Sequence, residues 1–234
     1  MIILSVGMPR AGSGWHYNLI HDLMKTTGAV DARVIREKYR LQGILTEVNY
    51  NIGVLSARRL GIVTLPALLG NTFVIKAHAG PTPPSRLLQS LGLLRITYIY
   101  RDPRDAMLSA YEIGASDLQR GRPNAFSHLT DFQQSLDFML HHVHVWERWV
   151  KEKDILMVRY EDMLREYDGE VRRLLGFLNL DGSRPEIQKV IEAHRATPER
   201  QARINRFREI YSAEQQQLLV EKMGASIARM GYDV

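Results

Sequence analysis

The chain has 234 residues, of which 45% are hydrophobic, so it is long enough to bury the core of an ordinary domain. It has no cysteine, which excludes disulfides, cysteine-ligated zinc and thiol catalysis. The formal net charge of +5 favours an anionic ligand, but no dense run of Lys and Arg with interleaved aromatic residues indicates a nucleic-acid partner.

No segment approaches the roughly 20 apolar residues that a membrane-spanning helix needs. The apolar run at residues 2–6 is not preceded by the basic segment and long apolar stretch of a secretory signal. We therefore expect a cytoplasmic protein without a membrane span, built as a single domain over residues 1–234. Nothing in the sequence indicates an oligomeric state.

Short apolar runs alternate with longer segments of helical spacing. The runs predict buried strands at residues 2–6, 72–75, 96–100 and 155–158. Apolar residues at helical spacing predict helices around residues 15–23, 131–150, 171–178 and 215–230. This alternation predicts an α/β fold, with a doubly wound, mostly parallel sheet flanked by helices. Such sheets bind ligands beyond the carboxyl ends of their strands.

Two segments have no clear pattern. Residues 30–69 are mixed, and we expect helices joined by loops. Residues 114–130 contain Gly121 and Pro123 among several polar residues. They form either a mobile flap over the ligand site or an ordinary surface loop.

The first motif is a glycine-rich loop between the first predicted strand and a helix. Gly7-x-x-x-x-Gly12-Ser13 has the spacing of a phosphate-binding loop, whose backbone N–H groups can point at a phosphate beside the positive end of the helix dipole. A Walker A loop needs lysine after the second glycine, whereas Ser13 and Gly14 follow here and the cation, Arg10, comes earlier. This departure argues against an ATPase or an ordinary kinase. The alternative is a tight turn without a ligand.

The second motif is Lys76-Ala-His78, which follows the second predicted strand. Residues two apart in an extended chain point the same way, so both side chains leave towards the ligand edge. Histidine is the natural general base near neutral pH, and His78 is the candidate to deprotonate an acceptor hydroxyl or amine. The alternative is a hydrogen-bonded structural histidine.

The third motif runs from Arg101 to Ser109, after the third predicted strand. Helix chemistry explains Asp102 as a cap, Pro103 as the first residue and Asp105 as an acid in the first turn. It does not explain Arg101 or Ser109, whose guanidinium and hydroxyl can converge on one phosphate. The alternative pairs Arg101 with Asp105 and leaves Ser109 as a packed helix residue.

Three histidines, His141, His142 and His144, could suggest a metal site. No carboxylate partner is evident nearby, so we expect a solvated helix face and no metal. We expect Trp146 and Trp149 to be core or rim anchors and not part of a cofactor site.

In chain order, these segments resemble the sulfotransferases that use 3′-phosphoadenosine 5′-phosphosulfate (PAPS). Pro9-Arg-Ala-Gly-Ser-Gly-Trp15 resembles the family's 5′-phosphosulfate loop, and the segment from Arg101 to Ser109 resembles its 3′-phosphate motif. Residues 74–78 resemble the segment with the catalytic histidine, and Tyr160-Glu-Asp-Met163 resembles a segment whose tyrosine contacts the adenine. The matches extend from residue 2 to about residue 180.

The resemblance implies a P-loop NTPase-like fold and a metal-independent reaction. A sulfuryl group would pass from PAPS to a hydroxyl or amine of a small-molecule, sugar or lipid acceptor, leaving 3′-phosphoadenosine 5′-phosphate (PAP). It implies that His78 is the base, that Arg10 stabilises the bridging oxygen and the 5′-phosphate, and that Lys76 neutralises the sulfuryl oxygens. The other residues that it assigns to the nucleotide are Ala11, Gly12, Ser13 and Gly14 at the 5′-phosphate, Arg101 and Ser109 at the 3′-phosphate, and Trp15 and Tyr160 at the adenine.

The sequence departs from the family's pattern in three places. Arg10 stands where the cytosolic branch usually has lysine, and Gly14 lacks the usual hydroxyl. The C-terminal Arg-Lys-Gly phosphate loop has no counterpart, and Arg203 is the candidate to replace it. The alternatives to a sulfotransferase are a P-loop kinase of a small molecule, which would need the missing Walker lysine, and a nucleotide-binding scaffold that has lost catalysis.

Overall fold

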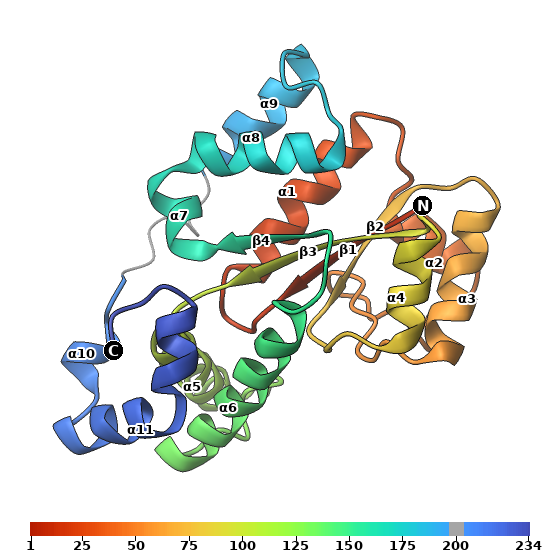
Figure 1. Ribbon diagram of the computed structural model, residues 1–234. Helices are drawn as coiled ribbons and strands as arrows, with labels where there is room; N and C mark the ends of the chain where they lie inside the picture. Colours follow the sequence, from red (N-terminus) through yellow and green to blue (C-terminus); the bar gives the residue numbers. More distant parts are fainter. Residues whose placement is uncertain (197–203) are drawn as a thin grey trace.

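Four parallel strands form a sheet at the centre of the molecule (Figure 1). The computed structural model describes residues 1–196 and 204–234. The strands are β1 (Ile2–Gly7), β2 (Phe73–Ala77), β3 (Leu94–Tyr100) and β4 (Ile155–Arg159), in the spatial order β2-β1-β3-β4. All four are strands that the sequence predicts, and no end differs from the prediction by more than two residues.

The strand order places a switch point between β1 and β3. β1 pairs with β2 on one side, where Val6 lies opposite Ala77, and with β3 on the other, where Gly7 lies opposite Ile99. The connection after β1 leads to β2, and the connection after β2 passes back over β1 to β3. In open α/β sheets the crevice outside such a point is where ligands bind.

Helices cover both faces of the sheet (Figure 1). Alternate residues of β1 face opposite layers, so Ile3 packs with one set of helices and Leu4 with the other. The layer on Ile3 contains α1 (Ser13–Lys25), α7 (Tyr160–Arg165), α8 (Tyr167–Leu178) and α9 (Pro185–Arg195). The layer on Leu4 contains α2 (Ala32–Lys38), α3 (Ala57–Leu68), α4 (Pro83–Ser90), α5 (Pro103–Gln119), α6 (Phe132–Trp149) and α11 (Ala213–Arg229), while α10 (Phe207–Ile210) packs on α5.

This arrangement confirms the α/β prediction. Asp102 caps α5 as the sequence suggests, accepting a hydrogen bond from the Arg104 N–H. Asp131 caps α6 in the same way, accepting one from the Gln134 N–H. In the described parts of the chain, no helix is long and apolar enough to cross a membrane.

The segment at residues 114–130 divides between a helix and a loop. Its first residues end α5, and the loop then folds back onto that helix. Gly114 allows this approach, because a Cβ there would lie 2.3 Å from the carbonyl oxygen of Phe126. Asn124 holds the loop, since its side chain accepts from the Phe126 N–H (2.7 Å) and donates to Asp117 (2.6 Å).

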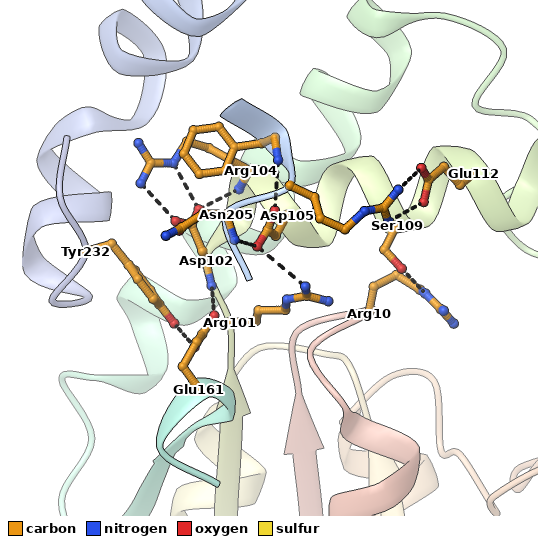
Figure 2. A network of polar contacts seen from close by, with 12 residues as sticks. Arg10, Arg101, Asp102, Arg104, Asp105, Ser109, Glu112, Glu161, Asn205 and Tyr232 are labelled. Atoms are coloured by element: carbon orange, nitrogen blue, oxygen red, sulfur yellow. Dashed lines mark hydrogen bonds and ion pairs between the residues drawn. The ribbon is translucent and has the colours of Figure 1, made fainter. Parts of the chain in front are cut away.

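Glu161, in α7, ties the end of β4 to the start of α5 and to the C-terminal chain (Figure 2). Its side chain is 1% exposed. One carboxylate oxygen accepts from the Asp102 N–H (3.2 Å) and the other from the Tyr232 hydroxyl (2.6 Å). Burial raises the pKa of Glu161, and these hydrogen bonds oppose that shift. This network fixes the backbone at Asp102, the residue after Arg101.

We predict that Tyr232→Phe destabilises the fold, because it leaves a buried carboxylate oxygen of Glu161 without its hydroxyl donor. The free energy of unfolding should fall by about 1–3 kcal/mol, measured by urea denaturation. Tyr111→Phe is the matched control, since Tyr111 is 37% exposed. Equal effects of the two substitutions would contradict the role of this hydrogen bond.

Candidate active site

The three sequence motifs meet at one cavity of about 1170 Å³. It lies at the carboxyl ends of β1, β2 and β3, at the switch point of the sheet. Its volume exceeds the roughly 300–1,000 Å³ of a site for one drug-sized ligand, which suits two ligands bound together. Of the residues that the sequence assigns to the site, those that line the cavity are Arg10, Gly12, Ser13, Gly14, Trp15, Lys76, His78, Arg101, Ser109 and Tyr160.

One assigned residue within the described parts of the chain is not in this lining. Ala11 is fully buried, and its backbone N–H already donates to the carbonyl of Met8 at 3.2 Å. The structure therefore gives the Ala11 N–H a partner inside the loop. Arg203 lies outside the described residues.

The glycine-rich loop turns sharply from β1 into α1. Arg10 and Gly12 both adopt the left-handed backbone conformation, with φ of 63° and 72°. A Cβ on Gly12 would lie 2.6 Å from the ring of Tyr160, so only glycine fits there. Gly12 is also the N-cap of α1, and it supplies no side-chain cap. The first N–H groups of α1 are thus oriented as an anion site requires.

His78 stands just beyond β2, half-buried at the cavity wall. Its Nδ1 lies 2.6 Å from the carbonyl oxygen of Gly7. A carbonyl can only accept, so Nδ1 carries the proton and donates, and Nε2 keeps its lone pair. Burial and the nearby Lys76 lower the pKa of His78 to about 4. The ring is therefore neutral at neutral pH, in the tautomer that a general base needs.

Lys76 lies on β2 and lines the cavity, although it is only 7% exposed. Burial, followed by the charge of Arg10, lowers its pKa to about 8. No carboxylate of the described residues forms an ion pair with it. A buried cation without a carboxylate partner is suited to an anionic ligand.

Two arginines, Arg10 and Arg101, line the cavity. Arg10 Nε donates to the hydroxyl of Ser109 at 3.2 Å, so the first and third motifs are in direct contact. Arg101 is 6% exposed, and its Nη2 lies 3.5 Å from Asp105. Burial and the charge of Arg101 lower the pKa of Arg10. The sequence left open two roles for Arg101, phosphate binding or pairing with Asp105. The structure contains the pair with Asp105, yet Arg101 also lines the cavity.

Asp105 has a role that the sequence analysis missed. Besides Arg101, its carboxylate accepts from the backbone N–H groups of Asn205 (2.7 Å) and Phe207 (3.1 Å) (Figure 2). Arg206, between them, forms a two-pronged ion pair with Glu112, at 2.6 and 2.9 Å. Asp105 thus holds the chain after residue 204 beside the arginine of the third motif. An acid in the first turn of a helix, as the sequence suggests, is therefore only part of the role of Asp105.

Trp15 is mostly a core residue. It is 2% exposed and stacks on Tyr167, with ring centroids 5.9 Å apart and an interplanar angle of 10°. Its indole N–H donates to the carbonyl of His194 at 3.3 Å. Tyr160 meets Trp15 edge to face, and the guanidinium of Arg101 lies 5.0 Å from the Tyr160 ring. Contact of Trp15 and Tyr160 with an adenine stays a prediction.

The expectation of a solvated histidine face on α6 is wrong for His142. His141 and His144 are exposed, but His142 is 8% exposed and lines the cavity. The helical period could have shown this, because His142 follows Phe138 by four residues on the buried stripe of α6. Within residues 1–196 and 204–234, no group of three or more His, Asp or Glu side chains is placed to bind a metal ion.

The tryptophans of α6 are core residues, as expected. Trp146 is 2% exposed and Trp149 is 1% exposed. Segments that the sequence left unassigned complete the cavity wall, among them residues 46–49 and the loop residues Ala125 and Phe126.

The chain matches the family model described as Sulfotransferase domain over residues 2–224. Its fold is similar to that of mouse sulfotransferase SULT7A1 complexed with PAP, with 15% identity, a TM-score of 0.58, and coverage of 98% of this chain and 87% of that chain. Retinol dehydratase in complex with androsterone and inactive cofactor PAP gives 15% identity, a TM-score of 0.58, and coverage of 100% and 82%. A sulfotransferase from Alicyclobacillus acidocaldarius gives 14% identity, a TM-score of 0.52, and coverage of 99% of this chain and 96% of that chain.

At these identities the structural likeness shows the fold alone, which is the P-loop-like fold that the sequence resemblance implies. No protein with a curated description matches the chain. The family model, however, covers nearly the whole sequence, including all three motifs. The chain belongs to the sulfotransferase domain family and is an enzyme that transfers a sulfuryl group.

Proposed function

We propose that this enzyme transfers the sulfuryl group of PAPS to a hydroxyl or amine of a small-molecule acceptor, with His78 as the general base. One observation carries the proposal. Nδ1 of His78 is hydrogen-bonded to the carbonyl oxygen of Gly7, so Nε2 keeps its lone pair, and His78 lines the cavity that the phosphate loop also lines. The base and the anion site thus share one wall.

The residues present fit a nucleotide with phosphates at both its 5′ and 3′ ends. The start of α1 and Arg10 suit the 5′-phosphate, while Arg101 and Ser109 suit the 3′-phosphate. The contact between Arg10 and Ser109 links the two ends. With Lys76, three cationic side chains of the described residues line this cavity, which favours negative charge in the ligand.

When bound, PAPS supplies the sulfuryl group: the acceptor oxygen forms the new bond to sulfur, the bond from sulfur to the bridging oxygen breaks, and its electron pair stays on the 5′-phosphate. Nε2 of His78 takes the proton of the acceptor hydroxyl. Arg10 and Lys76 hold positive charge where negative charge develops, which is the main catalytic contribution expected of a preorganised site. The aromatic side chains of Phe126 and Phe138 in the wall favour a small apolar acceptor over a sugar.

The nucleotide assignment is tested by calorimetric titration with PAP in the absence of metal, with ATP and Mg²⁺ as the comparison. We expect PAP to bind more tightly. Arg101→Ala should weaken PAP binding by about 10–100-fold, the value of a hydrogen bond to a charged group. The affinity for ADP, which lacks the 3′-phosphate, should change much less. Binding of ATP with Mg²⁺ alone would overturn the nucleotide assignment.

We predict that His78→Ala lowers kcat by roughly 10²–10⁴-fold, because it removes the proton acceptor. The affinity for PAP should stay nearly constant, since the base does not hold the phosphates. His144→Ala is the control, because His144 is exposed on α6. Full activity of the His78 variant would show that another group accepts the proton.

The pH profile of kcat/KM for PAPS, with phenol as acceptor, should have two limbs. His78 must be neutral, so activity falls as the pH drops through about 4. Lys76 must be charged, so activity falls as the pH rises through about 8. Arginine stays charged in this range, so Lys76→Arg should remove the alkaline limb. An alkaline limb unchanged in that variant would exclude Lys76 as its cause.

A further inference from the structure

The loop at residues 46–51 lines the cavity but has no role in the transfer proposed above. Two hydrogen bonds between Thr46 and Asn51 close it: the Thr46 N–H donates to the Asn51 carbonyl (3.1 Å), and the Asn51 N–H donates to the Thr46 hydroxyl (3.0 Å). The loop is also attached to β2, because the Lys76 N–H donates to the carbonyl of Tyr50 at 3.3 Å. The strand that carries Lys76 therefore holds this loop in place.

Asn49 presents an unused amide from this loop. Asn49 and Tyr50 are consecutive residues in the left-handed backbone conformation, with φ of 55° and 49°. Such conformations are uncommon outside glycine, and they occur preferentially at ligand sites. The side chain of Asn49 is half-buried and lines the cavity, and its polar atoms remain accessible. Within the parts of the chain that the structure describes, this amide has no hydrogen-bond partner, so it is available to a ligand.

The amide of Asn49 lies beside the first turn of α1. Gly14 is the second residue of that helix. Apart from the neighbours of Gly14 in α1, the nearest described atom to the point where a Cβ on Gly14 would lie is Nδ2 of Asn49, at 3.8 Å. The first N–H groups of α1 have no partner within the helix, and Gly12 supplies no side-chain cap. The NH₂ group of Asn49 therefore adds donors beside the N–H groups that form the anion site.

We propose that Asn49 is a further binding residue for the nucleotide, with Nδ2 donating a hydrogen bond to an oxygen of the 5′-phosphate. The sequence departs from the family's pattern at Gly14, which lacks the usual hydroxyl. The amide of Asn49 lies next to the space that a side chain at position 14 would fill, so a donor from a distant loop replaces that hydroxyl. The inference rests on the proposed function of the same cavity.

The test is calorimetric titration of Asn49→Gly with PAP and with adenosine 3′-phosphate, which has no 5′-phosphate. Glycine adopts positive φ readily, so this substitution removes the amide and keeps the backbone conformation. We expect the affinity for PAP to fall about 10–100-fold, the value of a hydrogen bond to a charged group. The affinity for adenosine 3′-phosphate should stay nearly constant. Asn179→Gly is the matched control, because Asn179 has a φ of 58° at the end of α8, outside the cavity lining.

A second substitution separates binding from a structural role. A Cβ on Gly14 meets Asn49 only at 3.8 Å, so Gly14→Ser has room for its side chain. In the Asn49→Gly background, Gly14→Ser should recover much of the affinity for PAP, because it returns a donor to the same place. In the native background it should change the affinity much less, since the amide already serves the phosphate. A serine at position 14 would not repair a merely structural defect in the loop.

The two proposals fail in different ways. If Asn49→Gly binds PAP as the native protein does, or loses affinity for adenosine 3′-phosphate by the same factor, the role of Asn49 is wrong and the nucleotide site stands. Equal effects of Gly14→Ser in the two backgrounds would overturn that role as well. If the native protein does not bind PAP, the proposed function is wrong and the role of Asn49 falls with it.

Discussion

The hydrogen bond from Nδ1 of His78 to the carbonyl of Gly7 joins the ends of two neighbouring strands. It fixes the place of the imidazole and also which of its nitrogens carries the proton. Only glycine fits at position 7, because a Cβ there would lie 2.7 Å from Cβ of Ser13 and 2.8 Å from Cγ2 of Ile99. The loop that holds the phosphate and the group that takes the proton are therefore one rigid unit, built on the pairing of β1 with β2.

Much of this could be predicted because its physical causes are local in the chain. Short apolar runs gave the four strands to within two residues, and the capping role of Asp102 follows from the residues beside it. The parallel sheet then places everything that follows a strand at one edge, so motifs far apart in the chain, at Arg10, Lys76 and Arg101, could be assigned to one site before any contact was known.

The rest could not be predicted because it depends on packing between distant segments. The carboxylate of Asp105 contacts backbone groups about 100 residues later in the chain, and no local pattern encodes that distance. Residues 46–49 reach the cavity from a loop without periodicity. His142 is the instructive case, because its burial could be predicted from its spacing from Phe138 on the same helix, whereas we expected all three histidines of this cluster to lie on one solvated face.

The depressed pKa of Lys76 has a thermodynamic consequence for ligand binding. With a pKa of about 8, this side chain is partly deprotonated in mildly alkaline solution before any anion arrives. A polyanion beside it favours the charged form, so the protein takes up a fraction of a proton, about half at pH 8, as the nucleotide binds. The heat of binding then includes the ionisation heat of the buffer that donates this proton, and the nucleotide affinity decreases with rising pH although no phosphate group titrates there.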